Sequence, residues 1–352
     1  EGHAVARARA GADKVEVLQG GVPRRRAQEA ELGDLAAEAK DGAAVHVVQA
    51  APLGRRARRF LDDVLLKVGH EHEQNGQLEE AYEFYKLTDQ SPSRERRIRI
   101  LDKGSNQEEA IALAQNILEQ PKNASEAIFA KDFLSRSGIR INRSMHAKLK
   151  DARTITIPKT TKRVEKEVAH YFEEEDWNVA HAENAIWRAV FGLLFWEELF
   201  NTEIGTFHHP LQRQPSDLLE EDFYMNRKDY LAQKLDGIKS KKRLTKLLNE
   251  TFQSKSGIAN RFIIWHPSIL ELCVCLVERV PLQGLKNVLL EMAKNIKENS
   301  TGFPDLFMWK ENTYRFYEIK SPNDHLSAQQ LFWLDFLSKN KIRAEILRVR
   351  YE

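Results

Sequence analysis

The chain has 352 residues and carries 54 Lys and Arg against 52 Asp and Glu, so its net charge of +2 excludes a strong general attraction to polyanions and confines any nucleic-acid surface to a local patch. A hydrophobic content of 42% excludes wholesale disorder, and the two cysteines, Cys273 and Cys275, are too few for a zinc site and fit a reducing compartment. No apolar run is long enough to span a bilayer and no secretory signal occurs, so we expect no membrane partner and an intracellular protein, nuclear in a eukaryote or in the cytoplasm and nucleoid of a bacterium.

Residues 1–59 differ in composition from the rest of the chain. Ala, Gly, Arg and Val dominate them, and residues 1–52 contain no Phe, Tyr, Trp, Ile, Ser, Thr or Asn. This bias predicts a low-complexity segment that is either disordered or an artefact of how the sequence was assembled. The first residue is Glu rather than Met, which indicates a fragment. We assign no function to this segment.

Residues 60–150 contain two segments of similar pattern, 76–93 and 104–123. Ala81 in the first matches Ala110 in the second, and Pro92 matches Pro121. A small residue at a fixed helical position, with Pro at the helix end, is typical of stacked helical hairpins. The pattern therefore predicts helical repeats that resemble tetratricopeptide repeats in a degenerate form.

Residues 151–260 are predicted to form a helical connector. Residues 182–200 have the apolar content of one long, largely buried helix, with Glu183 at its start, where a carboxylate is favoured by the helix dipole. A dense group of cations follows. It can be a DNA-binding patch that neutralises phosphates or the solvated surface of a helix, and the sequence leaves both interpretations open. The cations are Lys239, Lys241, Lys242 and Arg243.

Residues 261–352 have the pattern of an α/β module. Two apolar and aromatic runs of strand length, 305–309 and 314–320, flank a turn and predict a β-hairpin. Residues 325–340 show the leucine spacing of an amphipathic helix, and residues 343–351 predict a last strand. We expect the order helix, strand, strand, helix, strand.

Charged residues stand inside the predicted hairpin. Period-two alternation puts Glu318 and Lys320 on one face and Ile319 on the other, while Asp305 begins the partner strand. Two converging carboxylates are costly to bury unless a cation neutralises them, and oxygen ligands suit Mg²⁺ or Mn²⁺. With Lys320 able to orient water or stabilise developing negative charge, the pattern predicts phosphodiester hydrolysis. A structural ion pair of Lys320 with an acid is the alternative.

At these residues the sequence resembles known nucleases. Pro304-Asp305, followed by Glu318-Ile319-Lys320, resembles the PD-(D/E)xK nuclease motif, and "SPNDHLSAQQLFWL" is similar to the VRR-NUC branch of that superfamily. Upstream, "HAENAIWRAVFGLLFWEELF" resembles the helix that supplies an additional acidic ligand in the Fanconi-associated nuclease family, and "FHHPLQRQPSDLLEEDFYMNRKDYLAQKL" resembles the segment after it. The similarity covers roughly residues 60–352.

The resemblance implies roles for individual residues. It implies metal binding by Glu183, Asp305, Glu318 and the main-chain carbonyl of Ile319. It implies catalytic roles for Asp305, Glu318, Lys320 and Gln330. Two departures weaken the expected grip on phosphate. The family commonly has a basic residue shortly before Pro-Asp, where this chain has Asn299, Ser300 and Thr301, and His325 stands where the family usually has Arg.

We therefore expect an α+β multi-domain chain, with a tetratricopeptide-like helical region followed by a mixed α/β PD-(D/E)xK (VRR-NUC) module. The resemblance implies a Mg²⁺- or Mn²⁺-dependent nuclease that cuts branched or 5′-flap DNA, with endonuclease and 5′ to 3′ exonuclease activity, in interstrand crosslink repair. DNA is the expected partner, with protein partners through the repeats. The alternatives are a VRR-NUC Holliday-junction resolvase or phage or restriction-type endonuclease, and a non-catalytic repeat-based adaptor.

Overall fold

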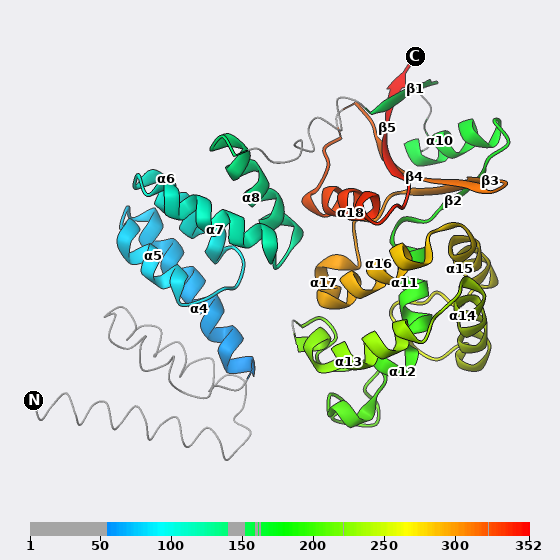
Figure 1. Cartoon of the computed structure of the whole chain (residues 1–352), viewed down its shortest axis with the longest axis horizontal. Helices are drawn as coiled ribbons and strands as arrows, with labels where there is room; N and C mark the ends of the chain where they lie inside the picture. The colour runs from blue at the N-terminus through cyan, green and yellow to red at the C-terminus, as the bar shows by residue number, and fades with distance from the viewer. Residues whose placement is uncertain (1–54, 140–151, 159–160, 162, 221, 323) are drawn as a thin grey trace, which may run out of the picture. The chain divides into compact units, whose positions relative to one another are not determined.

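The computed structural model describes residues 55–139, 152–158, 161, 163–220, 222–322 and 324–352 (Figure 1). The predicted low-complexity segment lies outside these residues up to position 54. The chain divides into two compact units, Glu1–Arg97 and Ile98–Glu352, and each is described by itself. Within the described residues, no helix is both long and apolar enough to cross a membrane.

The first unit contains a pair of packed helices, α4 (Arg55–Gln74) and α5 (Leu78–Lys86). Leu65 and Phe84 are buried between them, and the ring of His72 stacks on Phe84 with 5.1 Å between centroids. His72 therefore packs against an aromatic ring in this helix pair.

Three more helices follow at positions where helices were predicted: α6 (Ser93–Lys103), which crosses the boundary between the units, α7 (Gln107–Glu119) and α8 (Ala124–Arg136). Ala81 and Ala110, the small residues matched in the sequence, are both fully buried. In the second unit α7 packs on α8, and α8 packs on the helix of the C-terminal module, with Lys131 and Asp335 3.2 Å apart. The tetratricopeptide-like arrangement itself stays a prediction.

The second unit is built around a five-stranded sheet of order β1-β5-β4-β3-β2. Its strands are β1 (Arg153–Ile157), β2 (Asn178–His181), β3 (Leu306–Lys310), β4 (Thr313–Lys320) and β5 (Ala344–Tyr351). Strands β1 and β4 pair with β5 in parallel, whereas β2 and β4 pair with β3 antiparallel. The β3–β4 hairpin and β5 lie where the sequence predicts them. The two edge strands, β1 and β2, were not predicted, because short strands carry little periodic signal.

Helices cover both faces of the sheet. On one face α10 (Val164–Glu173) packs Val168 and Phe172 against side chains of β3, β4 and β5 that point to this face. On the other face lie α11 (Glu183–Leu194) and α18 (Ala328–Lys339), whose Trp187 and Trp333 stack on either side of Phe303, with centroids 5.0 and 4.1 Å apart. Phe303 is thus fixed two residues before Asp305.

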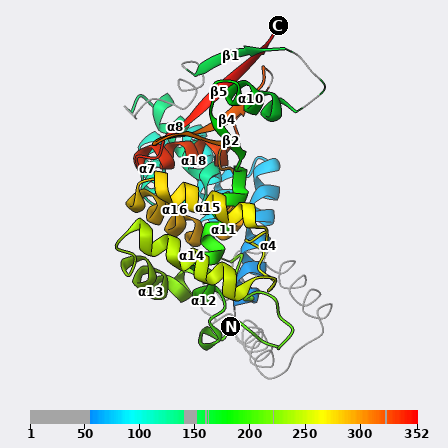
Figure 2. The same ribbon diagram turned by 90° about the vertical axis from the view of Figure 1, so that its right-hand side faces the viewer.

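The remaining helices form a layer that extends away from the sheet (Figure 2). They are α12 (Trp196–Leu199), α13 (Asp222–Asp236), α14 (Lys241–Lys255), α15 (Pro267–Arg279), α16 (Leu282–Lys294) and α17 (Ile296–Asn299), with a short 3₁₀ turn at Thr202–Ile204. The prediction of one continuous helix over 182–200 is wrong, because α11 ends at Leu194 and Phe195 leaves helical geometry with φ −95° and ψ 26°. Helix α12 follows as a separate turn packed on α13.

A buried arginine, Arg227, connects separate segments of this helical layer through hydrogen bonds. The guanidinium of Arg227 is fully buried and donates to Asp217 at 2.7 Å, to the Thr206 hydroxyl at 3.0 Å and to the Glu198 carbonyl at 3.0 Å. It therefore joins the segment 201–220 to α12 and α13.

We expect Arg227→Met to lower the free energy of unfolding by about 3–5 kcal/mol, because Asp217 would be left as an uncompensated buried charge. Urea unfolding of the variant measures the change. A double variant, Arg227→Met with Asp217→Leu, removes both charges and should recover much of the loss. A loss below about 1 kcal/mol in the single variant contradicts this account of Arg227.

Candidate active site

Asp305 joins three elements at one end of the sheet. Its carboxylate accepts a hydrogen bond of 2.8 Å from the main-chain N–H of Ile319 in β4. Its main-chain carbonyl accepts hydrogen bonds from the N–H groups of Ala182 and Glu183 at 3.1 and 3.2 Å. The residue that precedes β3 is thereby bound to β4 and to the start of α11.

Glu318 and Lys320 lie on the same face of β4, as predicted. Lys320 Nζ and Glu318 Oε1 are 3.0 Å apart, with exposed fractions of 9% and 1% for their side chains. Gln330 bridges them, donating to Glu318 at 2.6 Å and accepting from Lys320 at 3.2 Å. The three predicted catalytic residues from β4 and α18 therefore form one buried polar network.

The position of Gln330 comes from the way α18 begins. Ser327 is the N-cap residue, its hydroxyl accepts from the Gln330 N–H, and the Gln330 side chain accepts from the Ser327 N–H at 2.9 Å. This reciprocal arrangement is a capping box, which fixes both the helix start and the side chain at its third position. The same amide that caps α18 is therefore held against Glu318 and Lys320.

The carboxyl groups of the network resist ionisation. Burial raises the pKa of Asp305 to about 6, with Glu165 and Glu183 adding repulsion and the Ile319 N–H and Lys320 opposing the rise. Burial and the charge of Asp305 raise the pKa of Glu318 to about 8, against the attraction of Lys320. Two acids that repel one another in a buried site are characteristic of functional sites.

Glu183 is placed beside Asp305, with its carboxylate on the surface. Its main chain adopts φ +33°, a strained value for a residue with a side chain. Its carboxylate is exposed and accepts a hydrogen bond of 2.9 Å from Asn184, and its charge raises the pKa of both Asp305 and Glu318. The structure thus brings the start of α11 to the acids.

Two residues near the acids were missed by the sequence analysis. Glu165, on the first turn of α10, is close enough to raise the pKa of Asp305. Asn184 accepts a hydrogen bond of 3.2 Å from the Phe303 N–H, which fastens α11 to the segment before Asp305. Neither residue belongs to a local motif, so only the packing of α10 and α11 on the sheet reveals them.

The donor set fits a divalent cation in part. The second carboxylate oxygen of Glu318, Oε2, is buried without a hydrogen-bond partner in the described residues, which leaves one hard oxygen ligand available. Asp305, Glu318 and the Ile319 carbonyl would hold the cation. Across the part of the chain that the structure describes, however, no three Asp, Glu, His or Cys side chains are arranged to hold a metal ion, and the Glu183 carboxylate accepts a hydrogen bond from Asn184.

The predicted basic patch lies at the start of α14. Lys239, Lys242 and Arg243 are exposed, whereas Lys241 donates a hydrogen bond of 2.8 Å to the Glu278 carbonyl and burial lowers its pKa. The first turn of α14 contains cations and no acid, although the helix dipole disfavours positive charge at this end. The described residues show no contact between this patch and the acids around Asp305.

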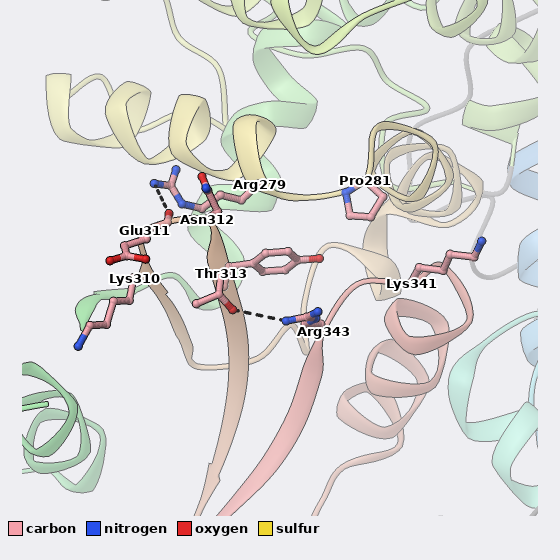
Figure 3. A pocket seen from close by; sticks show the side chains of 9 residues that line it. Arg279, Pro281, Lys310, Glu311, Asn312, Thr313, Lys341 and Arg343 are labelled. Carbon is pink, nitrogen blue, oxygen red and sulfur yellow. Dashed lines mark hydrogen bonds between the residues drawn. The ribbon is translucent and has the colours of Figure 1, made fainter. Parts of the chain in front are cut away.

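A cavity of about 490 Å³ lies at the opposite end of the hairpin, around the β3–β4 turn (Figure 3). Its wall includes four cations, but at least three of them already bind protein groups. Arg279 donates to the Glu311 carbonyl at 3.4 Å, Arg343 to the Thr313 hydroxyl at 3.4 Å, and Lys310 to the Glu175 carbonyl at 3.0 Å. None of the predicted site residues lines this cavity.

The chain is similar to known proteins in both sequence and structure. Residues 239–351 match the VRR-NUC domain family. A Fanconi-associated nuclease 1 homolog of Pseudomonas aeruginosa is 26% identical over 306 residues, which cover 85% of this chain and 54% of that protein. A Fanconi-associated nuclease 1 homolog of Arabidopsis thaliana is 32% identical over 195 residues, which cover 53% of this chain and 22% of that protein.

A solved structure has the same fold. The crystal structure of paFAN1 bound to 5′-flap DNA with a gap superposes with a TM-score of 0.69 at 22% identity, over 92% of this chain and 61% of that one. The chain therefore spans about half of the P. aeruginosa relative and about a fifth of the A. thaliana one. The match of residues 239–351 to the VRR-NUC domain family and these relatives confirm that the chain resembles the Fanconi-associated nuclease family.

Proposed function

We propose that this chain is a metal-dependent, structure-specific DNA nuclease that hydrolyses phosphodiester bonds of branched or 5′-flap DNA. The observation that carries the proposal is the cluster of the buried Glu318 and Lys320 with the half-buried Gln330 and Asp305 at the end of the β3–β4 hairpin, inside the VRR-NUC match. The nuclease names of its relatives and the flap DNA bound to paFAN1 support the substrate class, and a role in crosslink repair is proposed from the family resemblance.

Each residue of the network has a distinct part in the proposed reaction. Asp305 and Glu318, with the Ile319 carbonyl, would hold Mg²⁺ or Mn²⁺, and a side-chain rotation at Glu183 would add a third acid. Such a cation, when bound, polarises a phosphoryl oxygen and lowers the pKa of a bound water. Lys320 places its ammonium where negative charge develops on the phosphate. Gln330 holds the ammonium and the Glu318 carboxylate in position through its two hydrogen bonds.

The basic patch at the start of α14 supports contact with the DNA backbone. Three cations in one helical turn add to the positive end of the helix dipole, so the potential there is concentrated. We propose that Lys239, Lys242 and Arg243 neutralise phosphates, and that Lys241, bound to the Glu278 carbonyl, mainly orients the turn. We also propose that α4 to α8 form a tetratricopeptide-like arrangement and that these helices bind protein partners.

The alternative of a non-catalytic adaptor is disfavoured by the energetics of the network. An adaptor would gain nothing from one buried and one half-buried carboxyl group with raised pKa values and a carboxylate oxygen without a partner in the described residues. Incubation with end-labelled 5′-flap, 3′-flap, four-way and linear duplex DNA, with and without Mn²⁺, separates the proposals. Metal-dependent cleavage that prefers the 5′ flap supports this one, and no cleavage of any substrate supports the adaptor.

We expect Asp305→Asn and Glu318→Gln to abolish cleavage without loss of folding, because each removes a metal ligand at nearly constant volume. Lys320→Met should keep metal binding and lower turnover by roughly 10²-fold or more, since one electrostatic partner of the transition state is removed. Glu183→Gln should impair cleavage with little change in stability. Flap cleavage under single turnover and isothermal titration with Mn²⁺ give the two readouts. Undiminished cleavage by Asp305→Asn contradicts the site.

The raised pKa values predict how metal binding depends on pH. Both groups bind protons more tightly when folded, so their stabilisation is complete below ordinary carboxyl pKa values and is lost as pH rises through about 6 and about 8. The melting temperature of the metal-free protein should therefore fall from about pH 5 to about pH 8.5, while the increase caused by Mn²⁺ grows. A variant with both Asp305→Asn and Glu318→Gln should show a flatter profile and little Mn²⁺ effect. Identical profiles for the two proteins contradict the assignment.

Replacing Lys239, Lys242 and Arg243 by Gln should weaken binding of 5′-flap DNA and lower the salt slope by about 0.9 for each phosphate that is no longer neutralised. Fluorescence anisotropy over a series of NaCl concentrations measures both quantities. Lys246→Gln is the matched control, because Lys246 lies on the same helix and pairs with Glu250 at 3.6 Å. An unchanged slope in the triple variant would identify this turn as a solvated helix surface.

A further inference from the structure

An arginine on α11 is anchored to the segment that leads to Asp305. The Nε of Arg188 donates a hydrogen bond of 2.7 Å to the Ser300 carbonyl, which holds the half-buried guanidinium beside residues 300–304. Among the described residues, no acidic side chain lies within ion-pairing distance of Arg188. One edge of the guanidinium is thus fixed by the protein, and its terminal amino groups are left without a carboxylate.

The loop that contains a second arginine, Arg261, packs against the same stretch of α11. The loop between α14 and α15 packs on Gly192, where an added Cβ would lie 2.8 Å from Phe262 and 2.9 Å from Ile263. Gly192 follows Arg188 by one helical turn and lies on the same side of α11. Arg261 is exposed and precedes Phe262 in this loop, so its main chain lies beside the turn of α11 that contains Gly192.

The electrostatics agree with this placement. The pKa of Arg188 is lowered by burial first and then by the positive charge of Arg261, and Glu183 acts in the opposite direction. Two guanidinium groups repel one another, and the planar guanidinium favours carboxylate and phosphate groups, which it can bind through two parallel hydrogen bonds. An anion between the two side chains would replace repulsion with attraction. Phosphate is the anion that fits, because it accepts hydrogen bonds from several donors at once.

We propose that Arg188 and Arg261 form a binding site for a backbone phosphate of the DNA, next to Glu183 and Asp305. This inference rests on the proposed nuclease function and extends it to the residues that bind the DNA strand being cut. It also explains how positive charge reaches the segment before Asp305, since no Lys or Arg occurs from Glu298 to Trp309. Arg188 reaches that segment from a different element and supplies the missing charge there.

Binding without cleavage gives the test. We would measure fluorescence anisotropy of labelled 5′-flap DNA without divalent cations, over a series of NaCl concentrations, for Arg188→Gln, Arg261→Gln and the double variant. The double variant should lower the salt slope by about 0.9, because the site holds one phosphate, and each single substitution should weaken binding and lower the slope by part of that amount. Arg188→Lys keeps the charge and should keep the slope.

Arg315→Gln is the matched control, because Arg315 pairs with Glu345 at 3.2 Å in the exposed part of the sheet. Its slope should equal that of the unmodified chain. Arg261 is exposed, so its substitution should not prevent folding, and melting temperatures verify this for every variant. An unchanged slope and affinity in Arg261→Gln overturns the phosphate site.

The outcome also separates this site from the proposed function. Cleavage of flap DNA by the unmodified chain with Mn²⁺, together with an unchanged slope in both single variants, overturns the phosphate site alone. Reduced slopes without any cleavage overturn the nuclease and leave a DNA-binding site. A reduced slope in the control as well would show a general charge effect, and it would also overturn the site.

Discussion

The carboxylate of Asp305 accepts a hydrogen bond from the Ile319 N–H, while its carbonyl accepts two from the start of α11. These hydrogen bonds are directional, so they fix one residue relative to β4 and to a helix far away in the sequence. The stacking of Phe303 between Trp187 and Trp333 fixes the approach to that residue. Every other feature of the site depends on this junction, because it determines where the carboxylate lies relative to Glu318.

Burying the network opposes stability unless the surroundings offset its cost. Glu318 and Lys320 are almost inaccessible to water, and only Gln330 and one ion pair satisfy them. The stabilising contribution comes from apolar cores on both faces of the sheet, where Phe307 and Phe316 lie on one side and Tyr317 and Ile319 on the other. The fold therefore maintains a site that is electrostatically unfavourable in the absence of a cation.

Positive charge is placed unfavourably in two regions of the same unit. Cations occupy the first turn of α14 against the helix dipole, and Arg188 lies near Arg261. Under the proposed function both arrangements have one physical explanation, since a phosphate backbone would reverse the sign of each interaction. Acids at the end of the hairpin and cations near α11 and α14 would then act on one polyanionic substrate.

The sequence by itself determined the features that depend on local periodicity. Alternation in 313–320 placed Glu318 and Lys320 together, the turn at Glu311 and Asn312 set the hairpin, and the family motifs identified Gln330 and Glu183. Tertiary structure alone decided the edge strands β1 and β2, the break at Phe195 and the packing of Phe262 and Ile263 on α11 at Gly192. The same holds for the orientation of the Glu183 carboxylate towards Asn184. The reason is physical: backbone propensity and side-chain alternation act between neighbours in the chain, whereas these features arise from contacts between segments that meet only when the helices pack on the sheet.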